Sequence, residues 1–429
     1  MKQVDKREPL SIRSNILWNT IGNFAYLLSQ WILTYIVVKF LGFADAGVFS
    51  LAMTVAGVFA VVATYGMRCY QASDVEGRYS FGTYLRSRII TCTVALALCA
   101  VFAAVNGYST YVFLCIFLYM LFKVLEAMSD VYQGMLQREM RLDYVGKSYL
   151  VKGVAILVAF LVSVAVSRSL LMSICTMSIV MILVIALYER RRTTLFVEKA
   201  DTVQARSSLR KNVTRLLFAC LPLALYGLFF TVMGQAPRYF IEMLLGEEAL
   251  GYYASIAMPV VVIQVSGSFI FSPLVTPMAK SLSENNRRDF LSMVKKVVLF
   301  IVGLAIASVV LGAFFGDPVL IWAFGAEIEP YTYLLMPLVA CAIFTCLGWF
   351  LASVLTVMRA LKTLLVVSGV SMAIVLCGCV PFVQQWGMNG ASFILVIALV
   401  FFSLTCAFAI GLSERKRRAQ ERVSAQDVL

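Results

Sequence analysis

Twelve apolar segments, each long enough at about 20 residues to cross the hydrocarbon core of a bilayer, constrain the fold of this chain more than any other feature. Lipid offers no hydrogen bonds to an exposed backbone, so such segments span the membrane as helices. The sequence therefore predicts an all-α membrane protein. The predicted spans are residues 15–40, 46–66, 88–106, 109–129, 149–167, 169–188, 215–236, 250–272, 294–314, 331–357, 363–383 and 390–411.

Basic residues predict the orientation of these helices. The chain has 36 Lys and Arg against 23 Asp and Glu, a formal net charge of +13. Lys and Arg resist translocation, and an N-in/C-in arrangement places nearly all of them in or beside cytoplasmic segments. The exceptions are Lys39, Lys123, Arg168 and Arg238. Because the cations gather at helix ends, we expect them to contact membrane lipids, and we expect no nucleic acid partner.

The composition also restricts the chemistry. There is no histidine, which removes the commonest metal ligand and the commonest general base. The 11 cysteines lie almost wholly within apolar spans, where they behave as small hydrophobic residues. The sequence has no glycine-rich nucleotide-binding loop ending in Lys-Ser or Lys-Thr. We therefore expect that the protein does not use ATP hydrolysis directly. We expect no metal site, no catalytic residue and no cofactor.

An internal repeat accompanies the polar segment at the middle of the chain. Residues 41–49 and 245–253 both read Leu-Gly, four residues, Gly, one residue, aromatic, and both follow the first span of a half. Because each half has an even number of spans, a duplication gives two six-helix lobes with parallel pseudo-symmetry and a central cavity between the lobes. The predicted domains are a cytoplasmic tail (1–14), an N-lobe (15–188), a cytoplasmic linker (189–214), a C-lobe (215–411) and a basic tail (412–429).

The first span carries a one-sided stripe of polar residues. Asn15, Asn19, Asn23, Tyr26 and Gln30 fall within an arc of about 80° on a helix. Such residues form hydrogen bonds between membrane helices, or they line a water-filled cavity. Amides both donate and accept hydrogen bonds, which suits sugar hydroxyls.

The fourth span places Lys123, Glu126 and Asp130 on one helix face. In one interpretation, the Lys123–Glu126 pair is purely structural, because each residue neutralises the charge of the other. In the other, Lys123 contacts an anionic substrate, and Glu126 or Asp130 takes up a coupling proton or cation. Both interpretations stay open at this stage.

Two further arginines are candidates for binding phosphate oxygens. Arg238 shares a face of the seventh span with Gln235 and Glu242, and the alternatives for it are snorkelling to headgroups or pairing with Glu242. Arg68 opens a predicted interfacial helix after the second span, at the inner mouth of the N-lobe. Anchoring to cytoplasmic headgroups is the alternative there.

With these features the chain resembles the polysaccharide transporter branch of the multidrug/oligosaccharidyl-lipid/polysaccharide exporter superfamily. The resemblance covers helix count, orientation and duplication. Its local marks are Lys39–Gly42, Gly66–Asp74, Ala236–Glu242, Leu245–Gly246 and Pro318–Gly325. It implies a flippase of the bacterial cytoplasmic (inner) membrane that moves undecaprenyl-pyrophosphate-linked oligosaccharide repeat units of O-antigen or capsule by alternating access.

The resemblance also implies roles for the candidate residues. Arg68, Lys123 and Arg238 would hold the pyrophosphate, and Glu126 or Asp130 would serve ion coupling. The glycan would contact Asn19, Asn23, Tyr26, Gln30 and Gln235. The implied partners are the lipid-linked oligosaccharide, membrane lipids, and a polysaccharide polymerase with other assembly proteins; the expected state is a monomer.

Two other functions predict different features. A cation-coupled multidrug exporter of the same superfamily predicts an aromatic, anionic cavity. A membrane-embedded polymerase or ligase predicts a sizeable external catalytic loop. The longest external loop expected here, residues 312–329, is short and rather apolar, which disfavours the enzyme.

Overall fold

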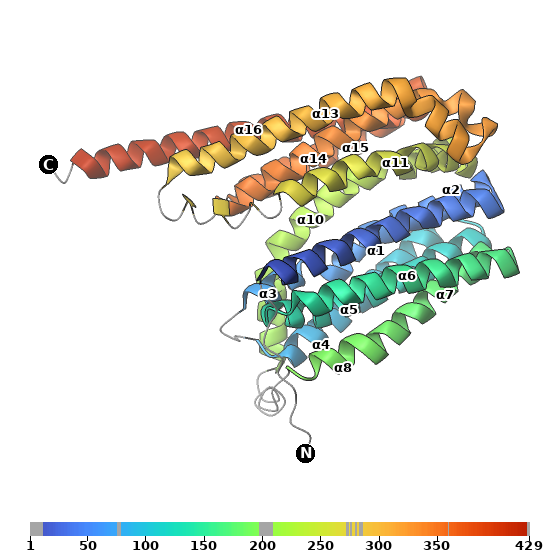
Figure 1. Ribbon diagram of the computed structural model, residues 1–429, viewed down its shortest axis with the longest axis horizontal. Coiled ribbons are helices and arrows are strands. Elements are labelled where there is room, and N and C mark those ends of the chain that lie inside the picture. Colours follow the sequence, from blue (N-terminus) through green and yellow to red (C-terminus); the bar gives the residue numbers. More distant parts are fainter. Residues whose placement is uncertain are drawn as a thin grey trace, which may run out of the picture. The chain divides into compact units, whose positions relative to one another are not determined.

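The described residues form twelve helices that are long and apolar enough to cross a membrane. Figure 1 shows the computed structural model. The structure describes residues 12–74, 79–196, 209–271, 274, 277–278, 281–282, 286–358 and 360–426, and these residues include no strand. The predicted all-α membrane fold is confirmed. The N-in/C-in orientation and the pseudo-symmetry stay predictions.

The helices follow the predicted order. The first half consists of α1 (Ile12–Leu41), α2 (Phe43–Thr64), α3 (Met67–Ser73), α4 (Phe81–Val105), α5 (Thr110–Arg138), α6 (Leu142–Ser167), α7 (Leu170–Val184), a π-helical turn (Ile185–Glu189) and α8 (Arg190–Thr193). The second half consists of α10 (Leu209–Leu245), α11 (Glu247–Phe271), α13 (Arg287–Phe324), a 3₁₀ segment (Ala326–Leu334), α14 (Leu335–Val357), α15 (Leu361–Trp386) and α16 (Met388–Gln426).

Two compact units divide the chain. The first contains the described residues of Met1–Thr231 together with Gly246–Ser255, and the second contains those of Val232–Leu245 and Ile256–Leu429. The division therefore passes through α10. The predicted lobe boundaries, 15–188 and 215–411, stay a prediction.

Close contact between α1 and α6 positions the polar residues of the first unit. A Cβ atom on Gly22 would overlap the carbonyl oxygen of Gly146, and one on Gly146 would overlap that of Trp18. Glycine lets two membrane helices approach to backbone contact in this way. The approach brings the ring centroid of Tyr26 within 5.5 Å of that of Tyr149, so that the two helices share one polar region.

The two repeated turns each contain a glycine with a positive φ. Gly42 has φ 92° and ψ 179°, and Gly246 has φ 91°; this positive-φ region is essentially restricted to glycine. Within the first unit, Gly47 contacts the backbone of the first residue of α11, and Gly251 contacts that of the first residue of α2. The repeat found in the sequence thus corresponds to a repeated and reciprocal local structure.

The structure corrects the predicted external loop at 312–329. Helix α13 continues to Phe324 with Pro318 inside it, and Gly325 ends it at φ 97°. Apart from Asp317, the residues around Pro318 are apolar, and membrane helices tolerate an internal proline where neighbouring groups satisfy the freed carbonyl. The predicted span ended at residue 314, so the helix extends ten residues beyond the prediction.

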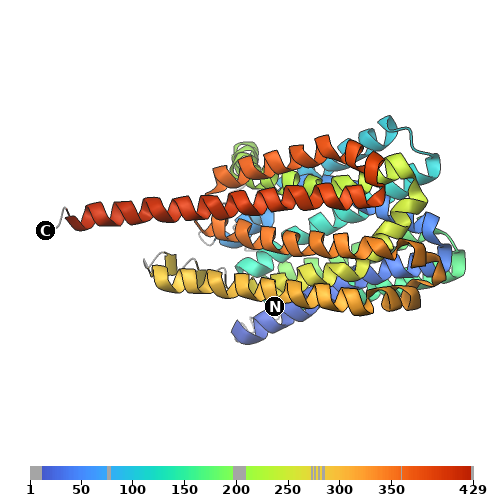
Figure 2. The same cartoon turned by 90° about the horizontal axis from the view of Figure 1, so that it is seen from above.

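Helical structure also extends into segments predicted as linker and tail. Glu189, placed at the start of the linker, ends the π-helical turn and is buried. Helix α16 continues beyond its span to Gln426, as a single helix in Figure 2. The burial of Glu189 matters for the site described below.

We expect Gly146→Val to destabilise the protein by about 1–3 kcal/mol, the usual cost of overpacking, because the new side chain would force α1 and α6 apart. Thermal unfolding followed with a thiol-reactive dye measures this, since buried cysteines such as Cys99 and Cys115 become reactive on unfolding. Gly303→Ala is the control, because a Cβ atom there meets nothing within 4 Å. Equal unfolding temperatures for the two variants would contradict the packing argument.

Candidate functional site

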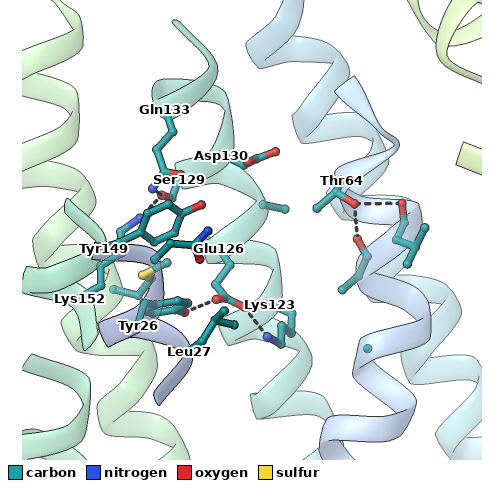
Figure 3. A pocket seen from close by; sticks show the side chains of 16 residues that line it. Tyr26, Leu27, Thr64, Lys123, Glu126, Ser129, Asp130, Gln133, Tyr149 and Lys152 are labelled. Atoms are coloured by element: carbon teal, nitrogen blue, oxygen red, sulfur yellow. Dashed lines mark hydrogen bonds and ion pairs between the residues drawn. The ribbon is translucent and has the colours of Figure 1, made fainter. Parts of the chain in front are cut away.

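A cavity of about 400 Å³ lies inside the first unit. One wall is apolar and comes from α2 (Gly57, Ala60, Val61, Thr64), with Leu27 of α1 and Met181 of α7. The polar lining, shown in Figure 3, comes from α1, α5 and α6. It consists of Asn23, Tyr26, Lys123, Glu126, Ser129, Asp130, Gln133, Tyr149 and Lys152.

Lys123 and Glu126 form an ion pair at the cavity surface. Lys123 Nζ lies 2.5 Å from Glu126 Oε2, and the two side chains are 24% and 20% exposed. Tyr26 of α1 donates its hydroxyl to the other oxygen of Glu126, as Figure 3 shows. The ammonium also lies over the rings of Tyr119 and Phe122. The one-face arrangement predicted for α5 thus brings a cation and a carboxylate together.

Asp130 lies between two arginines. Its Oδ1 is 3.1 Å from Nη1 of Arg68, and its Oδ2 is 3.1 Å from Nη2 of Arg88. Arg88 is completely buried and also donates to the carbonyl oxygen of Ala63 at 2.9 Å. Arg68 is 24% exposed and donates to the Tyr149 hydroxyl at 2.7 Å. The two opposite charges offset the cost of removing this carboxylate from water.

A second ion pair lies behind the cavity surface. Lys152 Nζ is 2.6 Å from Glu189 Oε1, with side-chain exposures of 1% and 0%. The same oxygen accepts hydrogen bonds from Ser129 (2.9 Å), Ser148 (2.6 Å) and Gln133 (3.0 Å). A buried pair is retained only with such additional hydrogen bonds, because both charges lose their hydration. The pair therefore ties the end of α7 to α5 and α6.

The cavity brings together only part of the predicted site. Asn23, Tyr26, Lys123, Glu126 and Asp130 line it. Arg68 adjoins it through its hydrogen bonds to Asp130, Gln133 and Tyr149.

Other predicted residues lie elsewhere. Asn15 accepts a hydrogen bond from the backbone N–H of Asp143 at the start of α6. At this end, the polar stripe of α1 therefore forms a hydrogen bond between two helices. Asn19 lies at the close crossing with Gly146, and Gln30 is buried outside the cavity. The remaining two residues, Gln235 and Arg238, belong to α10 in the second unit.

Three charged residues of this region were not among the predicted site residues. Arg88, Lys152 and Glu189 had all been counted with the cytoplasmic ends of helices, where cations commonly anchor. Lys152 nevertheless falls inside the predicted span 149–167, and an ion inside a span is the signal that could have identified it. With all groups ionised, Arg68, Arg88, Lys123 and Lys152 outnumber the three carboxylates by one charge, so the region is net positive.

The chain is similar in sequence to proteins of polysaccharide biosynthesis. Residues 12–283 match the family described as "Polysaccharide biosynthesis protein". The capsular polysaccharide biosynthesis protein CapF of Staphylococcus aureus is 21% identical over 343 residues, which cover 79% of this chain and 84% of CapF.

The fold is that of two groups of solved membrane proteins. An inward-facing multidrug resistance MATE family transporter of the MOP superfamily has a TM-score of 0.71 at 14% identity, covering 96% of this chain and 99% of the transporter. The lipid II flippase MurJ, in an inward closed conformation, has a TM-score of 0.68 at 12% identity, covering 92% of this chain and 87% of MurJ. At these identities the likeness concerns the fold, and it confirms the predicted all-α, multi-pass membrane fold.

Breaking the buried ion pair should destabilise the first unit. We expect Lys152→Met to cost about 3–5 kcal/mol, because it leaves Glu189 as an unpaired charge. The double variant Lys152→Met/Glu189→Met should recover most of that loss. Unfolding temperatures of wild type, both single variants and the double variant form the test. A double variant no more stable than Lys152→Met would show that the two charges are not coupled.

Proposed function

This chain belongs to the polysaccharide biosynthesis protein family, and we propose that it carries anionic, lipid-linked oligosaccharides across the bacterial inner membrane. In this proposal the cargo is an undecaprenyl-pyrophosphate-linked repeat unit, and the cycle is alternating access between two lobes with both termini in the cytoplasm. The capsular role in the name of CapF and the flippase role in the name of MurJ support this class of cargo.

The observation that carries the proposal is the net positive charge of a cavity built from membrane-spanning helices. Ions inside a membrane protein are costly and mark the path of a substrate or ion. Four cations against three carboxylates (Glu126, Asp130 and Glu189) favour an anion. A pyrophosphate headgroup has this charge, and its isoprenoid chain would stay in the bilayer.

The exposed cations are the proposed phosphate ligands. Arg68 and Lys123 are each 24% exposed, whereas Arg88 and Lys152 are buried. Arg68 presents a planar fork of donors, and Lys123 presents three donors on a flexible chain. Asn23 and Tyr26 are placed to meet the first sugar.

The roles of the other predicted residues stay part of the proposal. These are Asn19, Gln30, Gln235 and Arg238. Glu126 and Asp130 are the carboxylates available for ion coupling. A potential negative inside would favour outward movement of an anion by about 2.3 kcal/mol per charge per 100 mV. We further propose a monomer that works beside a polysaccharide polymerase and other assembly proteins.

A leaflet-resolved flipping assay with purified protein in liposomes tests the function. The substrate is a pyrophosphate-linked lipid oligosaccharide, and ethidium efflux from the same vesicles is the counter-assay. Flipping without ethidium transport supports the proposal. Ethidium transport without flipping would assign the chain to multidrug export. If the protein showed neither activity, both candidate functions would be refuted.

Neutralising the proposed phosphate ligands should slow flipping. We expect Arg68→Ala, Lys123→Ala and Arg238→Ala each to lose about tenfold to a hundredfold in rate at low substrate, the value of a hydrogen bond to a charged group. The matched control is Lys39→Ala near the end of α1, whose side chain is exposed and lies over Tyr35. Flipping at the wild-type rate by both Arg68→Ala and Lys123→Ala would refute the site.

A further inference from the structure

The carboxylates at the cavity surface are held by unequal numbers of cations. Among the described residues, Glu126 has one cationic partner, Lys123, at 2.5 Å. Asp130 has two, Arg68 and Arg88, each at 3.1 Å. An anion that takes a cation from each carboxylate would therefore leave them in different states.

An entering phosphate competes directly for these cations. Lys123 and Arg68 are each about a quarter exposed, so phosphate oxygens can reach the same N–H donors that the carboxylates now use. Phosphate and carboxylate oxygens accept charge-assisted hydrogen bonds of the same kind. The flexible stem of Lys123 allows its ammonium to turn from one acceptor to the other.

Glu126 would be left without a cation at that moment. It would lose its single ionic partner and gain an anionic neighbour, and an unpaired charge between membrane helices is costly. The side chain is 20% exposed at the cavity, so a proton from solvent can reach it. The Tyr26 hydroxyl, which contacts Glu126 now, can donate to the neutral acid as well.

Asp130 would keep its charge. When Arg68 turns to a phosphate, Arg88 remains at 3.1 Å, completely buried and tied to the carbonyl oxygen of Ala63. The Lys152–Glu189 pair is buried to within 1% and keeps its partners too. The number of retained cations thus distinguishes Glu126 from the other carboxylates.

We infer that Glu126 takes up one proton from solvent when an anionic headgroup binds Lys123, so that proton and substrate bind this unit together. The inference rests on the proposed function. By linkage, the coupling is reciprocal: protonation of Glu126 releases Lys123 for the phosphate, and the anion binds more tightly as the pH falls. A site at which proton and substrate compete would show the opposite dependence.

The surroundings of Glu126 contain few other groups that could produce this dependence. Among the described residues, the titratable and charged groups around it are Tyr26 from α1, Tyr119 and Lys123 from α5, and Tyr149 and Lys152 from α6, with Arg68 of α3 on the far side of Tyr149. Asp130 lies one turn further along α5. The residues of α2 that line the cavity do not titrate. Tyrosine and lysine change charge well above neutral pH, so a proton taken up near neutrality belongs on Glu126.

The test uses the full-length protein in nanodiscs and a short-chain isoprenyl-pyrophosphoryl-N-acetylglucosamine as probe. A phosphate monoester titrates near pH 6 and would obscure the result, whereas the pyrophosphate of this probe is esterified at both ends and holds its charge. Titration calorimetry in buffers of different ionisation enthalpy counts the protons taken up on binding. The same titrations repeated across pH give the change in affinity.

We expect the wild type to take up close to one proton per bound probe and to bind up to about tenfold more tightly for each unit fall in pH. Glu126→Gln should bind without proton uptake and without this slope. Glu126→Asp should restore both, which a merely structural role for Glu126 would not require. Asp130→Asn should retain proton uptake and bind the probe more tightly, because Arg68 loses a competing carboxylate.

The outcomes separate the two proposals. Binding by the wild type without proton uptake, or with proton release, overturns the inference and leaves the proposed function in place. Proton uptake that persists in Glu126→Gln but vanishes in Asp130→Asn also overturns it. Failure of the probe to bind wild type at any pH removes the proposed substrate class and the inference with it.

Discussion

The pairing of charges inside the membrane-spanning helices is the constraint on which the first unit depends. Hydrocarbon cannot hydrate an ion, so each charge there needs an opposite charge and hydrogen bonds. Glu126, Asp130 and Glu189 each meet at least one cation. These contacts connect α1, α3, α4, α5 and α6 with the turn after α7, so that the packing of the unit and the chemistry of its cavity are the same set of interactions.

Two kinds of pair serve different purposes in this arrangement. The Lys152–Glu189 pair is almost completely buried at the cavity wall and holds helices together. The Lys123–Glu126 pair is open to the cavity, and in the proposed function Lys123 exchanges Glu126 for the substrate. Asp130 has one partner of each kind. Arg88 is buried and holds Oδ2, whereas Arg68 is partly exposed and, in the proposal, leaves Oδ1 for the substrate. The position of each pair relative to the cavity surface, more than its distance, determines what it can do.

Hydropathy and charge placement were enough to predict the fold and part of the site. The twelve spans follow from segment length alone, and the spacing of Lys123 and Glu126 predicts their shared face. The roles of Arg88, Lys152 and Glu189 could not be predicted in the same way. A charge near the end of a span is equally compatible with an anchor at the membrane surface and with an ion in the protein interior. Their role depends on which helices pack around them, as does the different placement of Asn15 and Asn23 on one stripe.

The matching glycines Gly42 and Gly246 have a consequence for the history of the chain. If the halves arose by the predicted gene duplication, side chains in the two copies drift independently, and most resemblance between halves is lost. A backbone conformation restricted to glycine does not permit that drift, because any other residue would strain the turn. These two positions are therefore the marks by which the halves of more divergent relatives can be aligned, and a substitution at either would identify a lineage that has rebuilt this turn.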